Sequence, residues 1–125
     1  MQENIHDRFV EALAKTIREQ LHIGHGLDAK STQGPLINRR ALDKVSSLVE
    51  DSRQKGAQVV LGGKQSHVLP GNFYEPTLIT GINSSMDISR EEIFGPVAAI
   101  IKYMNMNNGH DAHFFACMKF HSDYL

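Results

Sequence analysis

The sequence is short of several features that would assign it to a structural class at once. It has one cysteine and no tryptophan, and its apolar runs are no longer than five residues, as at Val97 to Ile101. A single cysteine excludes an internal disulfide, and a membrane-spanning helix needs about 20 apolar residues in a row. The composition therefore excludes a disulfide-stapled scaffold and gives no sign of a membrane span.

An excess of charge of one sign and the common cofactor motifs are also lacking. Thirteen basic and fourteen acidic side chains give a net charge of −1, which argues against an electrostatic nucleic-acid binder. Glu3 and Asp7 stand where a secretory signal would be basic and then apolar, so we expect no signal peptide. The sequence has no glycine-rich dinucleotide turn after a strand, no phosphate loop and no His-Glu-x-x-His motif.

Two amphipathic helices are predicted in the first half of the chain. With 125 residues, 41% of them hydrophobic, the chain is long enough for one core. After a loop over 23–37, one helix is predicted over about 39–55, capped by Asn38 and ended by Gly56. The other is predicted over 5–21, capped by Asn4, from an apolar stripe: Ile5, Phe9, Leu13, Ile17 and Leu21, widened by Val10 and Ala14.

Three strands are predicted in the second half. They run from Ala57 to Leu61, from Tyr74 to Ile82 and from Val97 to Tyr103. Pro76 cannot donate to a ladder, so the second strand should start at an edge or a bulge. The third is mostly apolar, as in strands buried on both faces. Helices followed by strands predict an α/β layer rather than a bundle or a sandwich.

One cluster, Ser89 to Val97, has two interpretations. Its adjacent carboxylates, Glu91 and Glu92, precede Phe94, and Gly-Pro then turns the chain into an apolar strand. A carboxylate there can accept both hydroxyl hydrogens of a ribose diol, with the aromatic ring as a wall of the site. Alternatively, Ser89 and Glu92 form a capping box of a short helical turn opening at Ser89, and Phe94 belongs to the core. The residues alone favour the second interpretation.

Two other clusters favour structural interpretations. Gly71 to Thr77 is typical of a turn followed by a bulged strand start, with Glu75 facing solvent. Thr32 to Asn38 is typical of a tight turn that leads the chain to a helix cap.

The last residues hold an unusual group of side chains. His110, His113, Cys117 and His121 would share one face of a helix, and zinc takes His and Cys ligands. Four ligands spread along one straight helix cannot surround one ion, so an accidental cluster in a poorly ordered tail is favoured and no metal site is assigned. Catalysis by Cys117 would need a nearby base and a lowered pKa, and nothing indicates a substrate pocket.

Taken in order, the motifs resemble the aldehyde dehydrogenase superfamily. The resemblance covers residues 2 to about 102, and the Glu-Glu-x-Phe-Gly-Pro motif is its most specific part. It implies a partial catalytic domain over 1–102, with helices packed on a mostly parallel sheet, and a divergent, disordered tail over 103–125. The matching runs are Gly24 to Leu27, Gln33 to Asn38, Lys55 to Ala57, Gly62 to Lys64, Phe73 to Leu78 and Glu91 to Val97.

The resemblance implies a site for NAD or NADP. The family oxidises aldehydes to acids with these cofactors, through a cysteine thiolate. By motif, Glu92 matches the glutamate that binds the nicotinamide ribose, and Phe94 matches the aromatic residue beside the nicotinamide ring. Binding the ribose orients the cofactor.

The departures from the family pattern matter as much as the matches. The family's nucleophilic cysteine precedes the segment that resembles residues 2 to 10, whereas Cys117 follows the Glu92 motif. We therefore assign no catalytic residue to this chain and expect the chain alone to be inactive, without the family's general-base glutamate. The tail looks like the translation of an intron or of an altered reading frame.

Finer expectations follow from the same resemblance. The runs Thr32 to Asn38 and Asn72 to Leu78 look most like succinate-semialdehyde dehydrogenases, which implies an aldehyde substrate, homo-oligomers of the full-length enzyme, and no nucleic-acid or membrane partner. An animal enzyme of this kind would be mitochondrial; the alternative is cytoplasmic. A second hypothesis is a non-catalytic fragment that associates with full-length subunits, because missing neighbours should uncover Val97 to Ile101 and the first helix.

Overall fold

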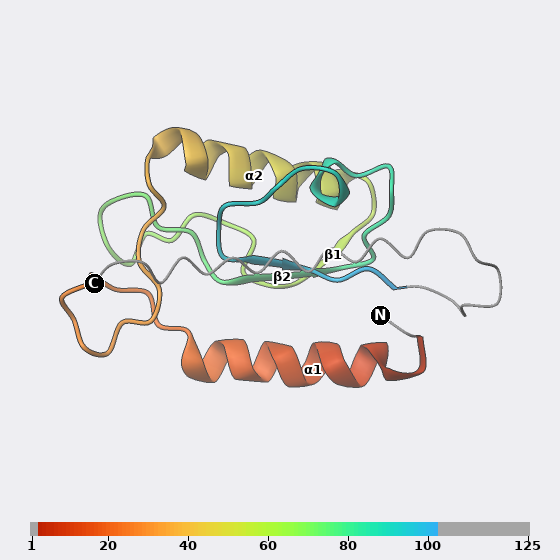
Figure 1. Cartoon of the computed structure of the whole chain (residues 1–125), viewed down its shortest axis with the longest axis horizontal. Helices are drawn as coiled ribbons and strands as arrows, with labels where there is room; N and C mark the ends of the chain where they lie inside the picture. The colour runs from red at the N-terminus through yellow and green to blue at the C-terminus, as the bar shows by residue number, and fades with distance from the viewer. Residues whose placement is uncertain (1–2, 103–125) are drawn as a thin grey trace.

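The computed structural model describes residues 3–102, which form a three-stranded sheet with one long helix on each face (Figure 1). The predicted fold class, helices packed on a sheet, is confirmed. The two helices lie on opposite sides of the strands. In chain order, the elements are α1 (Glu3–Gln20), α2 (Arg39–Gln54), β1 (Gln58–Leu61), β2 (Thr77–Thr80), the 3-10 helix η1 (Asp87–Ser89) and β3 (Val97–Ala99).

The sheet has the order β1-β2-β3 and is mixed. β1 runs antiparallel to β2, with a register shift between Val59 and Leu61, and β2 runs parallel to β3, with Thr77 opposite Val97. The β2–β3 connection crosses the α2 face through η1, which allows the parallel pairing. The prediction that the second strand starts at an edge or a bulge is wrong: β2 is the central strand and starts only after Pro76, and the register shift lies in β1.

Side chains alternate between two core clusters along the central strand. Leu78 packs in the cluster on the α1 side and Ile79 in the cluster on the α2 side, and both are fully buried. Val97 and Ala98 divide in the same way on β3. The prediction of a strand buried on both faces is confirmed. The expectation that Val97 to Ile101 is left uncovered is wrong, because α1 and α2 of the same chain cover this strand.

Helix α1 differs from its prediction at its start and in its buried face. It begins at Glu3, so Asn4 lies within it and is not its cap. Ile5 and Phe9 remain 49% and 42% exposed. The rest of the predicted stripe is confirmed: Val10, Ala14 and Ile17 are buried in the core cluster, and Leu13 and Leu21 pack against it partly buried.

Helix α2 has both predicted ends. The Asn38 side chain accepts a hydrogen bond from the backbone N–H of Ala41 at 2.9 Å. Gly56 follows the last turn with φ of +98°, a conformation that favours glycine. The tail with His110, His113, Cys117 and His121 lies outside the described residues. Among residues 3–102, no helix is long and apolar enough to cross a membrane.

Candidate functional site

The segment Glu91 to Pro96 presents two side chains outward from a buried anchor. Ile93 is 4% exposed and belongs to the core cluster that includes residues of α2. The residues on either side of it, Glu92 and Phe94, are exposed, and Phe94 is 60% exposed. The carboxylate and the ring are therefore both accessible to solvent, on either side of the buried anchor.

The turn after Phe94 is fixed by backbone contacts. The Val97 N–H donates to the Gly95 carbonyl at 2.8 Å, and the Pro96 carbonyl accepts from the Thr77 N–H at 2.8 Å. A Cβ on Gly95 would lie 2.8 Å from Cγ2 of Val45 on α2. Glycine is therefore required here by the close approach of the backbone to the helix, and this packing fixes where the segment enters β3.

The capping-box interpretation of this cluster is wrong. The short helical turn ends at Ser89 and does not open there. The Ser89 hydroxyl donates to the Met86 carbonyl at 2.7 Å. Met86 and Ile88 are buried, so core packing sets the position of η1. The interpretation of Phe94 as a core residue is also wrong, because its side chain is largely exposed.

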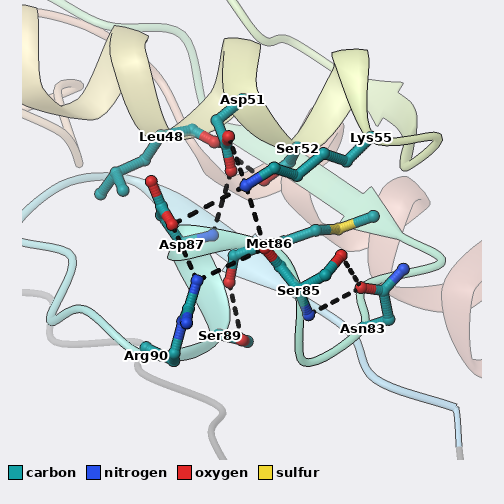
Figure 2. A network of polar contacts seen from close by, with 10 residues as sticks. All are labelled: Leu48, Asp51, Ser52, Lys55, Asn83, Ser85, Met86, Asp87, Ser89 and Arg90. Atoms are coloured by element: carbon teal, nitrogen blue, oxygen red, sulfur yellow. Dashed lines mark hydrogen bonds and ion pairs between the residues drawn. The ribbon is translucent and has the colours of Figure 1, made fainter.

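A polar network joins the last turns of α2 to the loop before the site (Figure 2). Asp51 Oδ2 accepts from the Asp87 N–H at 3.0 Å, and Lys55 Nζ lies 2.7 Å from Asp51 Oδ1. Lys55 also donates to the Ser85 carbonyl at 2.9 Å, and Arg90 lies 3.0 Å from Asp87 Oδ1. The Lys55 ammonium and then the Asp87 N–H hold the pKa of Asp51 below its usual range.

The two adjacent carboxylates of the motif have different surroundings. Glu91 forms an ion pair with Lys44 of α2, with 3.2 Å between Oε2 and Nζ. Its N–H donates to the Asp87 carbonyl at 2.9 Å. Glu92 is exposed and follows directly. Glu91 therefore contacts the helix, and Glu92 lies exposed beside buried Ile93.

The pair Glu92 and Phe94 suits a flat ligand with neighbouring hydroxyl groups. A carboxylate accepts two hydrogen bonds from a diol, and an exposed aromatic ring offers an apolar face. Residues 3–102 contain no cluster of three or more His, Cys, Asp or Glu side chains that could hold a metal ion. Within this part of the chain, the arrangement offers a carboxylate acceptor and an apolar ring face.

The Gly71 to Thr77 cluster is structural, as predicted, but more buried than expected. Phe73 and Tyr74 are each 1% exposed, and Tyr74 pairs with Gln65 in an isolated antiparallel bridge. Glu75, expected to face solvent, is half-buried. It lines an open hollow of about 410 Å³ together with Lys64, Gln65, Ser66, His67 and Val68.

The Thr32 to Asn38 cluster contains a structural residue that the sequence pattern missed. Gln33 is buried, and its side-chain amide donates to the Tyr74 carbonyl at 2.6 Å. The Leu36 N–H donates to the Asn72 carbonyl at 2.8 Å. These bonds tie two segments about 40 residues apart, so a polar turn in the sequence is an internal crosslink in the fold. A single glutamine in a polar run carries no signal of this role.

Comparisons with known proteins show one family to which this chain is similar. The model of the aldehyde dehydrogenase family matches residues 1–112. The chain is 47% identical over 103 residues to a mitochondrial succinate-semialdehyde dehydrogenase of Hylobates lar, and 45% identical over the same length to one of Arabidopsis thaliana. Each alignment covers 82% of this chain but 19% of the relative. The chain thus spans about a fifth of the length of the relatives it matches.

Solved structures give the same result. A succinate-semialdehyde dehydrogenase from Burkholderia pseudomallei is 39% identical, with a TM-score of 0.79, over 83% of this chain and 21% of that one. An NADP-dependent enzyme of E. coli is 40% identical, with the same TM-score and the same coverage. Betaine aldehyde dehydrogenase from Staphylococcus aureus, in complex with NAD+, is 34% identical, with a TM-score of 0.76. The match covers 83% of this chain and 21% of that one.

Proposed function

This chain belongs to the aldehyde dehydrogenase family, and we propose that it is a segment of an NAD(P)-dependent oxidoreductase that converts succinate semialdehyde to the acid. Identity to succinate-semialdehyde dehydrogenases in both animals and plants supports the substrate. The names of these relatives support a mitochondrial location, with the cytoplasm as the alternative. We propose that the whole enzyme is a homo-oligomer and that nucleic acids and membranes are not its partners.

Glu92 and Phe94 are the proposed cofactor-binding residues of this segment. The carboxylate would accept hydrogen bonds from the hydroxyls of the nicotinamide ribose, and the ring would lie beside the nicotinamide. The observation that carries this proposal is their common exposure on either side of buried Ile93. The bound cofactor supplies a hydride acceptor; the two side chains supply orientation. We propose either NAD or NADP as the cofactor, because one similar structure is of an NADP-dependent enzyme and another is in complex with NAD+.

An NMR titration of the whole chain with NAD+ and with NADP+ tests this site. Backbone signals of residues 92–95 should shift on titration, and Glu92→Gln or Phe94→Ala should weaken the response several-fold. Glu91→Gln is the matched control, because Glu91 faces Lys44 and should leave the response nearly unchanged. An unaltered chain whose site signals ignore both cofactors would contradict the proposal.

We also propose that the 125-residue chain alone does not oxidise aldehydes. The family's nucleophilic cysteine would precede its first residues, and Cys117 follows the Glu92 motif. Formation of NAD(P)H from succinate semialdehyde by the purified chain measures this directly. Turnover that Cys117→Ala abolishes would overturn it.

A second candidate function is a non-catalytic partner of full-length subunits. The observation that favours it is the exposure of Ile5 and Phe9, which lie one turn apart on α1. Co-purification with an intact dehydrogenase should then occur and should be lost with Phe9→Lys, but not with the exposed neighbour Arg8→Gln. A monodisperse chain that ignores the intact enzyme would rule this function out.

A further inference from the structure

We propose that helix α2 positions the cofactor-binding segment, with Asp51 and Lys55 as its positioning residues. The inference rests on the proposed function of Glu92 and Phe94 and extends it to two residues that do not touch the ligand. Both side chains reach from one helix to backbone atoms of the loop before the site, as Figure 2 shows.

The contacts to the backbone, and not the ion pairs, carry this role. The Lys55–Asp87 and Arg90–Asp87 pairs join half-exposed or exposed side chains, and such pairs contribute little. Asp51, by contrast, is 24% exposed at its side chain and accepts from the Asp87 N–H at 3.0 Å. Lys55 Nζ donates to the Ser85 carbonyl at 2.9 Å. Charge-assisted bonds of this kind fix the path of the chain.

Asp87, which is held by Asp51, is connected to Glu92 through the backbone. The Asp87 carbonyl accepts from the N–H groups of Arg90 and Glu91 at 3.0 and 2.9 Å. Glu91 immediately precedes Glu92 and meets α2 again through Lys44, at 3.2 Å. A shift of Asp87 away from the helix would therefore move the residue next to the proposed ribose-binding carboxylate.

The downstream side of the segment also rests on α2. Ile93 packs in the cluster that contains Val45, and a Cβ on Gly95 would lie 2.8 Å from Val45 Cγ2. The helix thus holds the segment through the backbone contacts of Asp51 and Lys55 and through packing against Val45. It leaves the side that carries Glu92 and Phe94 open. Residues that orient a ligand must themselves be held in place by the packing and hydrogen bonds behind them.

Amide hydrogen exchange of the whole chain, followed by NMR, tests the anchoring. Asp51→Ala should speed exchange at Asp87 and Glu91 by about tenfold or more relative to Ile100, whose N–H donates within the sheet. Asp51→Asn keeps an acceptor oxygen and should restore much of the protection. Glu50→Ala is the control, since this neighbouring carboxylate pairs with Arg53 on its own helix. Unchanged exchange at Asp87 in both Asp51 variants would overturn the proposal.

The NAD+ response of the Phe94 signal tests the positioning role. We expect Asp51→Ala to weaken apparent NAD+ affinity by about tenfold while the fold is retained, and Asp51→Asn to rescue most of it. Equal NAD+ affinity in the unaltered chain and in Asp51→Ala, with faster exchange at Asp87, would overturn the link to binding. Absence of any response in the unaltered chain would contradict the proposed function instead, and the exchange rates would still decide the anchoring.

Discussion

At the scale of single residues, two neighbouring glutamates differ in their contacts. Both are exposed, but Glu91 pairs with Lys44 of α2 at 3.2 Å, and Glu92 lies beside buried Ile93. The sequence pattern could nominate the pair for diol binding. It could not separate them, because the partner of Glu91 lies 47 positions earlier on a helix whose contacts arise only on folding.

Gly95→Ala should destabilise the chain and loosen the entry into β3. Its new Cβ would lie 2.8 Å from Val45 Cγ2, and overpacking of this kind costs about 1–3 kcal/mol. Urea unfolding measures the change. Gly34→Ala is the control, because a Cβ there meets nothing within 4 Å. Combining Gly95→Ala with Val45→Ala should cost less than the sum of the two substitutions, since the clash is removed. Equal effects of the Gly95 and Gly34 substitutions would contradict the packing argument.

Tyr74 should make the chain sensitive to alkaline pH. Burial raises the pKa of its phenol, against the smaller opposite effect of a hydrogen bond with Ser46. The pKa in the folded state therefore lies above the unfolded value of about 10. The contribution of Tyr74 to the free energy of unfolding is therefore fully present below about pH 10, and it is lost as the pH rises from there through the folded pKa. Urea midpoints measured across this range should decline less in Tyr74→Phe. Parallel declines in the two proteins would contradict the assignment to Tyr74.

At the scale of elements, local signals predicted well and long-range ones poorly. Asn38 and Gly56 mark the ends of α2 because capping depends on neighbours within a few residues. The predicted apolar stripe of α1 is buried from Val10 onward, but Ile5 and Phe9 remain exposed, because only packing against the sheet decides how much of a stripe is covered. The pattern at Ser89 predicts a helix start, but the short helix ends there, because the burial of Met86 fixes its position.

The same distinction explains what could be predicted of the candidate site. The cluster from Ser89 to Val97 was found from its residue types, but its residues favoured a capping box and a core aromatic. The capping box fails because the packing of buried Met86 and Ile88 makes the short helix end at Ser89. The core aromatic fails because the exposure of Phe94 depends on how Ile93 and Gly95 pack on a distant helix. The anchoring by Asp51 had no signal beyond an i,i+4 pair with Lys55, which is common on helix surfaces.

Asn38→Ala should weaken α2 by removing its cap. The Asn38 side chain accepts from the Ala41 N–H at 2.9 Å, and loss of such a bond costs about 1 kcal/mol. Thermal unfolding should show the loss, and Asn38→Asp should recover most of it because the carboxylate also accepts this bond. A fully stable Asn38→Ala chain would mean that the first turn is held by other contacts.

At the scale of the whole molecule, one thin sheet serves two core clusters. Leu78 and Ile79 are adjacent on β2, both fully buried, and face α1 and α2 respectively. The proposed binding segment packs, through Ile93, in the cluster on the α2 side. Helix α1 packs in the cluster on the opposite face of the sheet. Each helix packs on one face of the same strand, β2. Loss of this strand would remove the packing surface of both helices, so residues 3–102 should unfold as a single cooperative unit.

Leu78→Ala and Ile79→Ala test this coupling in a matched pair. Each removes a large side chain from a site with no exposure, which costs about 2–5 kcal/mol. We expect both to lower the urea midpoint while the transition stays single, with circular dichroism and tyrosine fluorescence coinciding. In the native state, Ile79→Ala should also speed exchange at the Glu91 amide by more than Leu78→Ala does, because Ile79 shares the cluster of Ile93. Two separate transitions would show that the faces fold independently, and α2 would then need no sheet to hold the segment.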